Sequence, residues 1–251
     1  MLTRRSLLGA IPALGFAAPA AAQVTGTRIV PHGELDPDIY SLDAWVDKYG
    51  RPTAKVMVNG KGPYSFMVDT GSSTTVIAQR LVATLAVPIT GMATVNGTTG
   101  STETPVGNLR LLETGAVRKE DIRVAVLSDN ALARADGILG ADVFAGKRLV
   151  FNISGKVVRV EPSKRSPRIA PDRGNMKVRD GLLAEIDGSI GVVGAKMMLD
   201  TGAQHCIANL PLSDALRRAH PRLQRIDRVE VMGVTGQVLI GQFIALPKVE
   251  L

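Results

Sequence analysis

The sequence contains the motif Asp-Thr-Gly twice. The two copies consist of Asp69, Thr70 and Gly71, and of Asp200, Thr201 and Gly202. Each copy directly follows three apolar residues, a pattern that predicts a buried strand ending at the aspartate. Two such aspartates can form a carboxylate pair that shares one proton. Two carboxylates about 3 Å apart cannot both ionise, so one pKa rises while the other falls.

A pair of this kind can hydrolyse an amide bond. The ionised carboxylate acts as a base on water, and the protonated one polarises the carbonyl group. A glycine after each threonine lets two backbone loops approach closely, because it has no Cβ. The threonine hydroxyls can hydrogen-bond to the opposite loop. We therefore predict that Asp69 and Asp200 are catalytic and that the turn residues support them, namely Thr70, Gly71, Ser72, Thr201 and Gly202.

The residue after each motif predicts a difference between the two aspartates. Ser72 can donate a hydrogen bond to Asp69, whereas Ala203 has no donor to offer Asp200. Since a hydrogen bond to the charged form lowers a pKa, we expect Asp69 to be the ionised member and Asp200 the protonated one. The alternative is that each aspartate only accepts backbone hydrogen bonds in a glycine-flanked turn.

A second pair of motifs follows the first at a matched distance. Residues 95–100 and 231–236 are glycine-flanked turns, and Gly97 and Gly233 are separated by 136 residues (233 − 97), close to the 131 between the aspartates (200 − 69). Two motifs in the same order, at nearly the same spacing, indicate a duplicated domain.

The elements that must position these motifs are mostly strands. We expect strands at residues 54–58, 64–68, 122–127 and 157–160, with a turn at Asn59-Gly60. Short helices are expected at residues 75–85 and 211–220. Residues 162–175 are rich in proline and lack apolar periodicity, which predicts a linker between an N-terminal lobe at residues 23–161 and a C-terminal lobe at residues 176–251.

The N-terminus has the features of an export signal. Arg4 and Arg5 precede an apolar run that ends in Ala20-Ala21-Ala22, a small-residue cleavage pattern. We expect residues 1–22 to be a twin-arginine signal peptide and the mature protein to be periplasmic or secreted. An uncleaved membrane anchor is the alternative. No other apolar stretch is long enough to predict a membrane span.

Taken together, the motifs resemble the pepsin–retropepsin superfamily of aspartic proteases, in particular single-chain bacterial relatives of retropepsins. The segment 136–140, Asp-Gly-Ile-Leu-Gly, resembles the strand that packs beneath the catalytic loop in that superfamily. The resemblance implies an all-β, bilobal fold of two pseudo-symmetric β-barrel lobes. It also implies an endopeptidase that needs no cofactor and binds a polypeptide under two flaps. The flap residues would be Gly97, Thr98, Thr99, Gly100, Gly233, Thr235 and Gly236.

Two features depart from that superfamily. The second lobe has no segment like residues 136–140, whose equivalent would lie beyond Leu251, so this lobe looks incomplete; residues 24–52 are a candidate to fill the gap. The flap has Thr98 and Thr99 in place of the tyrosine of pepsin-like enzymes. Two alternatives therefore stay open: an inactive, protease-like binding module, and a homodimer that uses Asp69 alone.

Composition argues against other classes. The net charge is +7, but the basic residues are scattered and accompany no recognition motif, so we expect no nucleic-acid partner. The three histidines lack metal-ligand spacing, and we expect no metal site. The single cysteine, Cys206, precludes an intramolecular disulfide, and we expect it to be a small core residue.

Overall fold

The computed structural model describes residues 40–42, 44–48, 50–152, 155, 157–163, 176–179, 183–223 and 225–250. The predicted signal peptide at residues 1–22 lies outside these residues, as does most of the predicted linker at residues 162–175. The linker was expected to begin at Pro162, but a strand continues through that residue.

Strands predominate, which confirms the all-β prediction. In the first half of the described chain (residues 40–163) the elements are β1 (Tyr40–Leu42), β2 (Ala44–Val46), β3 (Pro52–Val58), β4 (Lys61–Val68), β5 (Val76–Ala78), α1 (Gln79–Leu85), β6 (Ile89–Gly97), β7 (Gly100–Thr114), β8 (Val117–Leu127), β9 (Gly137–Leu139), β10 (Lys147–Asn152) and β11 (Val157–Pro162). In the second half (residues 176–250) they are β12 (Met176–Arg179), β13 (Leu183–Ile190), β14 (Val193–Met198), α2 (Leu210–Ala219), β15 (Arg225–Met232), β16 (Val238–Ile244) and β17 (Val249–Glu250).

An eight-stranded sheet forms most of the first half. Its order is β2-β3-β4-β9-β5-β8-β7-β6, and a further pairing of β3 with β7 curls the sheet upon itself. Strand β9 lies at its centre, parallel to β4 and antiparallel to β5. The tight turn between β3 and β4 uses Asn59 and Gly60, both with positive φ, as a two-residue hairpin turn requires. Strands β1, β11 and β10 form a separate three-stranded sheet.

The buried core lies almost entirely in the first half. Its cluster of buried apolar side chains runs from Leu42 to Val160 and includes Phe66, Leu109 and Ile138, each at most 1% exposed. In the described second half, the buried apolar side chains are Ile186, Ile190 and Leu216. Because burial of apolar area is the main stabilising term in folding, the first half holds the main structural support for the site.

The second half repeats part of the first. Strand β13 begins 131 residues after β3 (183 − 52), and α2 begins 131 residues after α1 (210 − 79), the same offset that separates the two aspartates. Strands β12, β13 and β14 form one sheet, to which β17 adds through β13, and β15 and β16 form a hairpin. Helix α2 begins at the N-cap Asn209, whose side chain accepts a hydrogen bond from the amide of Leu212.

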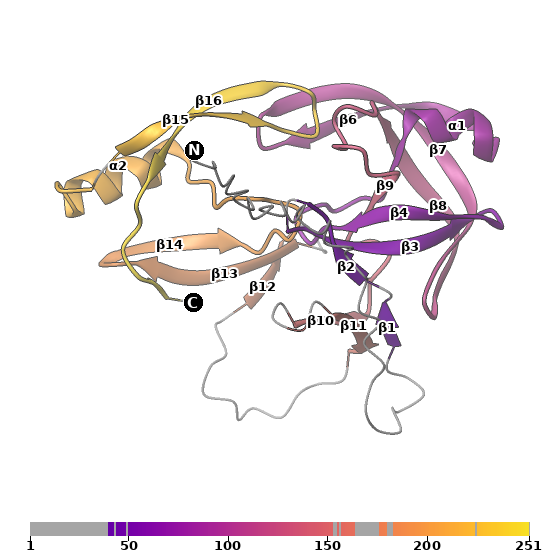
Figure 1. The fold of residues 1–251 in the computed structure, drawn as a ribbon, viewed down its shortest axis with the longest axis horizontal. Coiled ribbons are helices and arrows are strands. Elements are labelled where there is room, and N and C mark those ends of the chain that lie inside the picture. The colour runs from indigo at the N-terminus through magenta and orange to yellow at the C-terminus, as the bar shows by residue number, and fades with distance from the viewer. Residues whose placement is uncertain are drawn as a thin grey trace, which may run out of the picture.

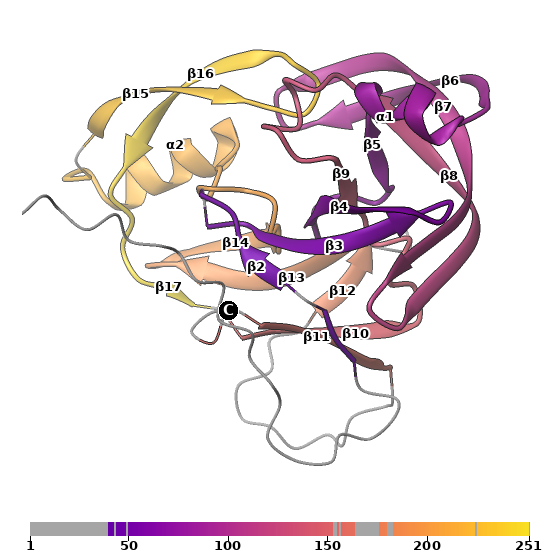
Figure 2. The ribbon, with the colours of Figure 1, turned by 45° about the vertical axis from the view of Figure 1, so that its right-hand side comes forward.

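Two hairpins lie on the same side of the molecule. Figures 1 and 2 show the β6–β7 hairpin and the β15–β16 hairpin at the top, with their tips pointing toward each other. Strands β3, β4, β13 and β14 lie below them, and the β1–β11–β10 sheet is at the bottom in Figure 1.

The structure corrects the bounds of one expected element, and it contradicts a second expectation only where it describes the residues concerned. The helix expected over residues 75–85 begins only at Gln79, because the β-branched residues before it form β5, which pairs with β8 and β9. Residues 24–52 do not complete the second half where they are described: β1 pairs with β11 and β2 with β3, all in the first half. Residues 24–39 lie outside the described residues.

Within the described second half, no strand takes the place that β9 has in the first. The consequence is a difference in exposure. Among the residues that the structure describes, fourteen large apolar side chains are exposed, and twelve of them lie between Val192 and Val249. Val76, after the first motif, is 4% exposed, whereas Ile207, its equivalent by the 131-residue offset, is 53% exposed.

Candidate active site

Asp69 lies just beyond the end of β4, beside β9 in the middle of the first-half sheet. Its backbone amide donates to the carbonyl of Leu139 at 3.1 Å, which extends the β4–β9 pairing by one residue. Its carboxylate Oδ1 accepts a hydrogen bond from the amide of Gly71 at 2.8 Å. Asp69 is 9% exposed, so the buried strand that precedes it holds the carboxyl group largely away from water.

Asp200 follows β14 in the same way but in a more open setting. The amide of Leu199, just before it, donates to the carbonyl of Ala184 in β13 at 3.1 Å. Oδ1 of Asp200 accepts hydrogen bonds from the amides of Gly202 at 2.8 Å and Ala203 at 3.0 Å. Unlike Asp69, Asp200 is exposed to solvent.

The threonines of the two motifs cross-link the turns reciprocally. The Thr70 hydroxyl donates to the carbonyl of Leu199 at 2.6 Å and accepts from the amide of Thr201 at 3.2 Å. The Thr201 hydroxyl donates to the carbonyl of Val68 at 2.7 Å and accepts from the amide of Thr70 at 3.1 Å. Each hydroxyl thus ties its own turn to the backbone of the other, so the two aspartates are held in one rigid unit.

The glycines of the motifs allow the two carboxylates to reach this arrangement. A Cβ placed on Gly71 would lie 2.5 Å from Cγ of Asp200, and one on Gly202 would lie 2.5 Å from Oδ2 of Asp69. Both separations are shorter than side chains tolerate, so any residue larger than glycine would push the opposing carboxylate away. The structure therefore brings Asp69, Gly71, Asp200 and Gly202 together.

The surroundings of Asp69 determine its protonation. Burial is the main cause that raises the pKa of Asp69 to about 7. The negative charge of Asp200 and a hydrogen bond between the two carboxyl groups act in the same direction, against opposing hydrogen bonds from the amides of Gly71 and Ser72. Below about pH 7, Asp69 therefore favours the protonated form. This reverses the sequence-based expectation, in which Asp69 was the ionised member.

That expectation failed because Ser72 does not act as predicted. Its hydroxyl donates to the carbonyl of Thr74 at 2.8 Å instead of to Asp69. The sequence indicates a possible donor but not its direction, whereas the burial of Asp69 depends on the whole sheet around β4. The dominant effect on the pKa is therefore desolvation.

The predicted flap residues meet at the hairpin tips. The hydroxyls of Thr99 and Thr235 lie 3.1 Å apart within hydrogen-bonding distance, and the Gln237 amide donates to the carbonyl of Ser101 at 3.2 Å. Space is tight there: a Cβ on Gly233 would lie 2.2 Å from the Thr99 hydroxyl, and one on Gly97 would lie 3.1 Å from Thr235. Gly100 lies against Gln237 in the same way.

Two of the predicted flap residues lie outside this contact. Thr98 is exposed. Gly236 has φ +76° and open space around it, and its amide donates to the carbonyl of Gly233 within the β15–β16 turn. Gly236 is thus a turn former, because positive φ favours glycine.

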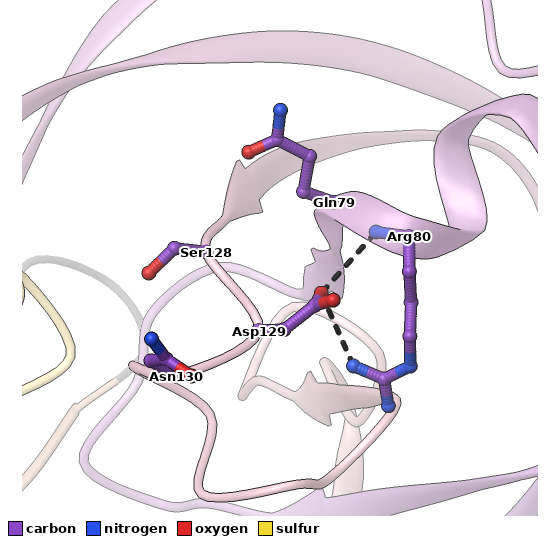
Figure 3. Close-up of a pocket in the computed structure, with 5 residues that line it drawn as sticks. All are labelled: Gln79, Arg80, Ser128, Asp129 and Asn130. Carbon is purple, nitrogen blue, oxygen red and sulfur yellow. Dashed lines mark hydrogen bonds and ion pairs between the residues drawn. The ribbon is translucent and has the colours of Figure 1, made fainter.

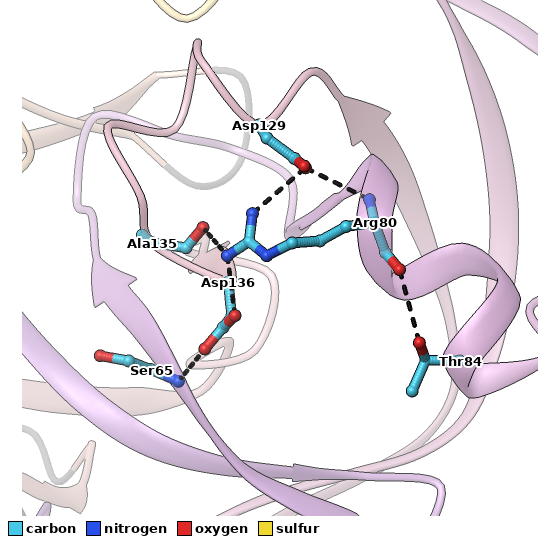
Figure 4. Close-up of polar contacts among 6 residues, drawn as sticks. All are labelled: Ser65, Arg80, Thr84, Asp129, Ala135 and Asp136. Atoms are coloured by element: carbon cyan, nitrogen blue, oxygen red, sulfur yellow. Dashed lines mark hydrogen bonds and ion pairs between the residues drawn. The ribbon is translucent and has the colours of Figure 1, made fainter.

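Sequence reasoning missed a polar network that fixes β9. Asp136, just before β9, accepts from the amide of Ser65 at 2.7 Å and from the guanidinium of Arg80 at 2.8 Å (Figure 4). Arg80 also pairs with Asp129 at 3.1 Å and donates to the carbonyl of Ala135. The network joins β4, α1 and the loop before β9. The spacing of Arg80 and Asp136 in sequence gives no signal of this contact.

A surface pocket next to this network is separate from the aspartate pair. Figure 3 shows its lining, from the start of α1 and the loop after β8. The residues are Gln79, Arg80, Ser128, Asp129 and Asn130. Because Arg80 and Asp129 pair with each other, the pocket presents little unpaired charge, and it does not identify the candidate site.

Cys206 is exposed, which corrects the expectation of a core residue. Its turn lies where the second half has no counterpart of β9 among the described residues, so no strand covers it. The neighbouring His205 packs edge to face on Phe243, with ring centroids 5.1 Å apart. In the parts of the chain that the structure describes, no group of three or more His, Cys, Asp or Glu side chains is placed to hold a metal ion.

Comparison with known proteins finds a family match over part of the chain. Residues 54–143 match the aspartyl protease family. The match supports the aspartic protease superfamily and a protease function. The matched segment includes Asp69, the β6–β7 hairpin and β9, but ends before the second motif.

Among solved structures, the chain is similar to a retropepsin-like aspartic protease from Rickettsia conorii. The identity is 18%, the alignment covers 49% of this chain and 88% of that chain, and the TM-score is 0.35. No curated protein sequence matches the chain. Neither helix of the described residues is long and apolar enough to cross a membrane.

Proposed function

We propose that this protein is an aspartic endopeptidase in which Asp69 and Asp200 together activate a water molecule. The observation that carries the proposal is the reciprocal bonding of Thr70 and Thr201, which holds the two aspartates against the opposing glycines. Rigid positioning of two carboxylates with different environments is what acid–base hydrolysis requires. The aspartyl protease match over residues 54–143, which includes Asp69 but not Asp200, supports the protease part of the proposal.

The environments of the two carboxylates assign their roles in the proposed mechanism. Asp200 is solvated and accepts two backbone hydrogen bonds, so it serves as the base that takes a proton from water. Asp69 is protonated because burial raises its pKa, so it donates a hydrogen bond to the carbonyl oxygen of the substrate. The oxygen of the water adds to the carbonyl carbon, and the proton on Asp200 then passes to the leaving amine as the C–N bond breaks.

The proposed substrate is a polypeptide in extended form. It would lie between the aspartates and the hairpin tips, where the flap residues Gly97, Thr98, Thr99, Gly100, Gly233, Thr235 and Gly236 would contact it. Extended chains pair through their backbone with exposed strand edges. In this proposal each half of the chain is one lobe of the enzyme.

Two alternatives compete with this proposal. A homodimer pairing two first halves through Asp69 would leave Asp200 idle. The bonds from Thr70 and Thr201 disfavour it, because they already engage the Asp69 turn within one chain. An inactive, peptide-binding module is favoured by the exposed apolar side chains of the second half. It would bind peptide without cleaving it.

We also propose that the protein is exported through the twin-arginine signal of residues 1–22. N-terminal sequencing of protein from the periplasmic or secreted fraction should give a chain beginning at Gln23. Recovery of the full-length chain from the cytosol alone would contradict this.

The proposed activity can be tested by digestion of a mixed peptide library. We expect cleavage of internal peptide bonds, inhibited by a pepstatin-type compound, which mimics the hydrated carbonyl between two aspartates. An unchanged library after digestion across acid and neutral pH, with peptide binding retained, would support the binding module instead.

A further inference from the structure

A buried contact behind the Asp69 turn has no part in the mechanism so far. Thr75, 0% exposed, lies just before β5. Its hydroxyl donates to Oδ1 of Asp142 at 2.7 Å, and its amide donates to Oδ2 at 2.9 Å. The same hydroxyl accepts from the amide of Gly140 at 3.2 Å. The hydroxyl and the amide of Thr75 are therefore both bonded to residues 140–142.

Asp142 is fixed from its own side as well. The carboxylate accepts a third hydrogen bond, at Oδ1, from the amide of Val143 at 2.9 Å. The carboxylate thus bonds both the segment after the aspartate turn and the segment after β9. These three bonds make Asp142 a polar link between the two segments.

The linked segments are those that shape the Asp69 turn. The amide of Asp69 donates to Leu139, and the amide of Ala141 donates to the carbonyl of Ser72 at 2.8 Å. A Cβ on Gly140 would lie 2.6 Å from the backbone of Thr74. The turn from Asp69 to Thr75 is therefore bonded to residues 139–142 at its start, middle and end, and Asp142 holds the end.

The second turn lacks this support in the described structure. The residue equivalent to Thr75 is Cys206 (75 + 131), and it is exposed. The Asp200 turn is instead bonded to the first half, through Thr201 to Val68 and through Thr70 to Leu199. The position of both aspartates therefore depends on the Asp69 turn.

We propose that Asp142, acting through Thr75, is a positioning residue that holds the Asp69 turn, and through it the aspartate pair, in its reactive arrangement. The inference rests on the proposed protease function. Neither residue contacts the reacting atoms. Their loss acts by displacing Asp69 relative to Asp200, the ionisable group that faces it.

The test compares Thr75→Val, Asp142→Ala and the double variant with Thr114→Val. Thr114 is a matched control: it is 2% exposed and its hydroxyl donates to the carbonyl of Lys55 in the strand pair of β3 and β7, away from the aspartates. Thr75→Val and Asp142→Ala should each lower kcat by up to about 10²-fold, with little change in KM, because small misplacements of catalytic groups have costs of that size. The kcat of the double variant should be no lower than that of the less active single variant, because both substitutions break the same link.

Conservative variants guard against misfolding. Thr75→Ser keeps the hydroxyl and should restore most of the kcat, and Asp142→Asn keeps one acceptor and should fall between wild type and Asp142→Ala. Rates are compared per folded molecule, well below each Tm. If Thr114→Val lowers kcat as much as Thr75→Val does, or if Thr75→Val leaves kcat unchanged, the inference is overturned.

A second readout separates this inference from the proposed function. The titration of the Asp69 carboxyl carbon, followed by NMR, should shift in Thr75→Val and Asp142→Ala but not in Thr114→Val. If the wild type cleaves no peptide but these shifts occur, the protease proposal fails and the positioning inference stands. An unmoved Asp69 titration in both variants overturns the inference, whether or not the protein is a protease.

Discussion

Asp69 and Gly202 lie so close together that a Cβ on Gly202 would be 2.5 Å from Oδ2 of Asp69. Gly71 and Asp200 stand in the same relationship. These two contacts explain why each aspartate is followed by a glycine two residues later: the opposing carboxylate occupies the space that a side chain would fill.

This close approach predicts the effect of a single methyl group. Gly71→Ala and Gly202→Ala should each lower kcat/KM by at least about 10²-fold, because the added Cβ displaces the opposing carboxylate. Gly194→Ala is the control, since a Cβ there would meet nothing within 4 Å. Steady-state kinetics of the three variants make the comparison. Equal activity of Gly202→Ala and Gly194→Ala would show that the carboxylates do not need their present separation.

The protonation of Asp69 predicts the alkaline limit of activity. Since burial raises the pKa of Asp69 to about 7, the proton that polarises the substrate is present below that value and lost above it. We expect kcat/KM to fall as pH rises through about 7. In Asp200→Asn the neighbouring charge is gone, so the pKa of Asp69, measured by NMR, should decrease. If the kcat/KM of wild type instead falls at a pH well below 7, near the ordinary pKa of an aspartate, Asp69 is not the acid.

Stability should depend on pH through the same group. Between the ordinary aspartate pKa of 3.8 and the raised value of about 7, the native protein keeps the Asp69 proton while the unfolded chain loses it. Wild type therefore loses stability as pH rises through this window. Asp69→Asn has no such proton to lose. Its free energy of unfolding, relative to that of wild type, should therefore rise by roughly 2–4 kcal/mol across the window. Urea unfolding at both ends of the window measures this, and a constant difference would mean that Asp69 is not desolvated.

The hairpin contact predicts how the flaps hold the substrate. Thr99→Val and Thr235→Val each remove the hydrogen bond between the tips, which contributes about 0.5–1.5 kcal/mol to the closed arrangement. We expect kcat/KM to fall by up to about tenfold. Thr94→Val is the control, because it removes an exposed bond to Glu103 within the β6–β7 hairpin alone. A similar loss in Thr94→Val would indicate a general effect on the hairpin instead.

The parts of this site that depend on local pattern and repetition could be predicted from the sequence. The apolar runs before each aspartate indicated the strands, and the 131-residue offset indicated the pairing of motifs that the structure places together. Neither the burial of Asp69 nor the contacts of Asp136 and Asp142 could be predicted. Both depend on how β9 inserts between β4 and β5. The resemblance indicated that residues 136–140 pack beneath the catalytic loop, but not how deeply Asp69 is buried or which groups Asp136 and Asp142 contact.

The burial of residues in the second half could not be predicted from the sequence either. Cys206 was expected to be buried, and its equivalent in the first half, Thr75, is buried, yet Cys206 is exposed. Burial at this position comes from the strand that packs on it, and the described second half has no such strand. Local pattern cannot predict burial when the packing partner is missing.

The most direct test of the joint action of the two aspartates is the activity of two single variants, Asp69→Asn and Asp200→Asn. An amide has nearly the shape of a carboxyl group but neither ionises nor serves as the base. Each variant should therefore lower kcat by several powers of ten, on the order of 10³ or more, while circular dichroism shows the fold retained. Activity in Asp200→Asn equal to wild type would contradict the joint action and point to the homodimer. Full activity in both variants would refute the protease assignment.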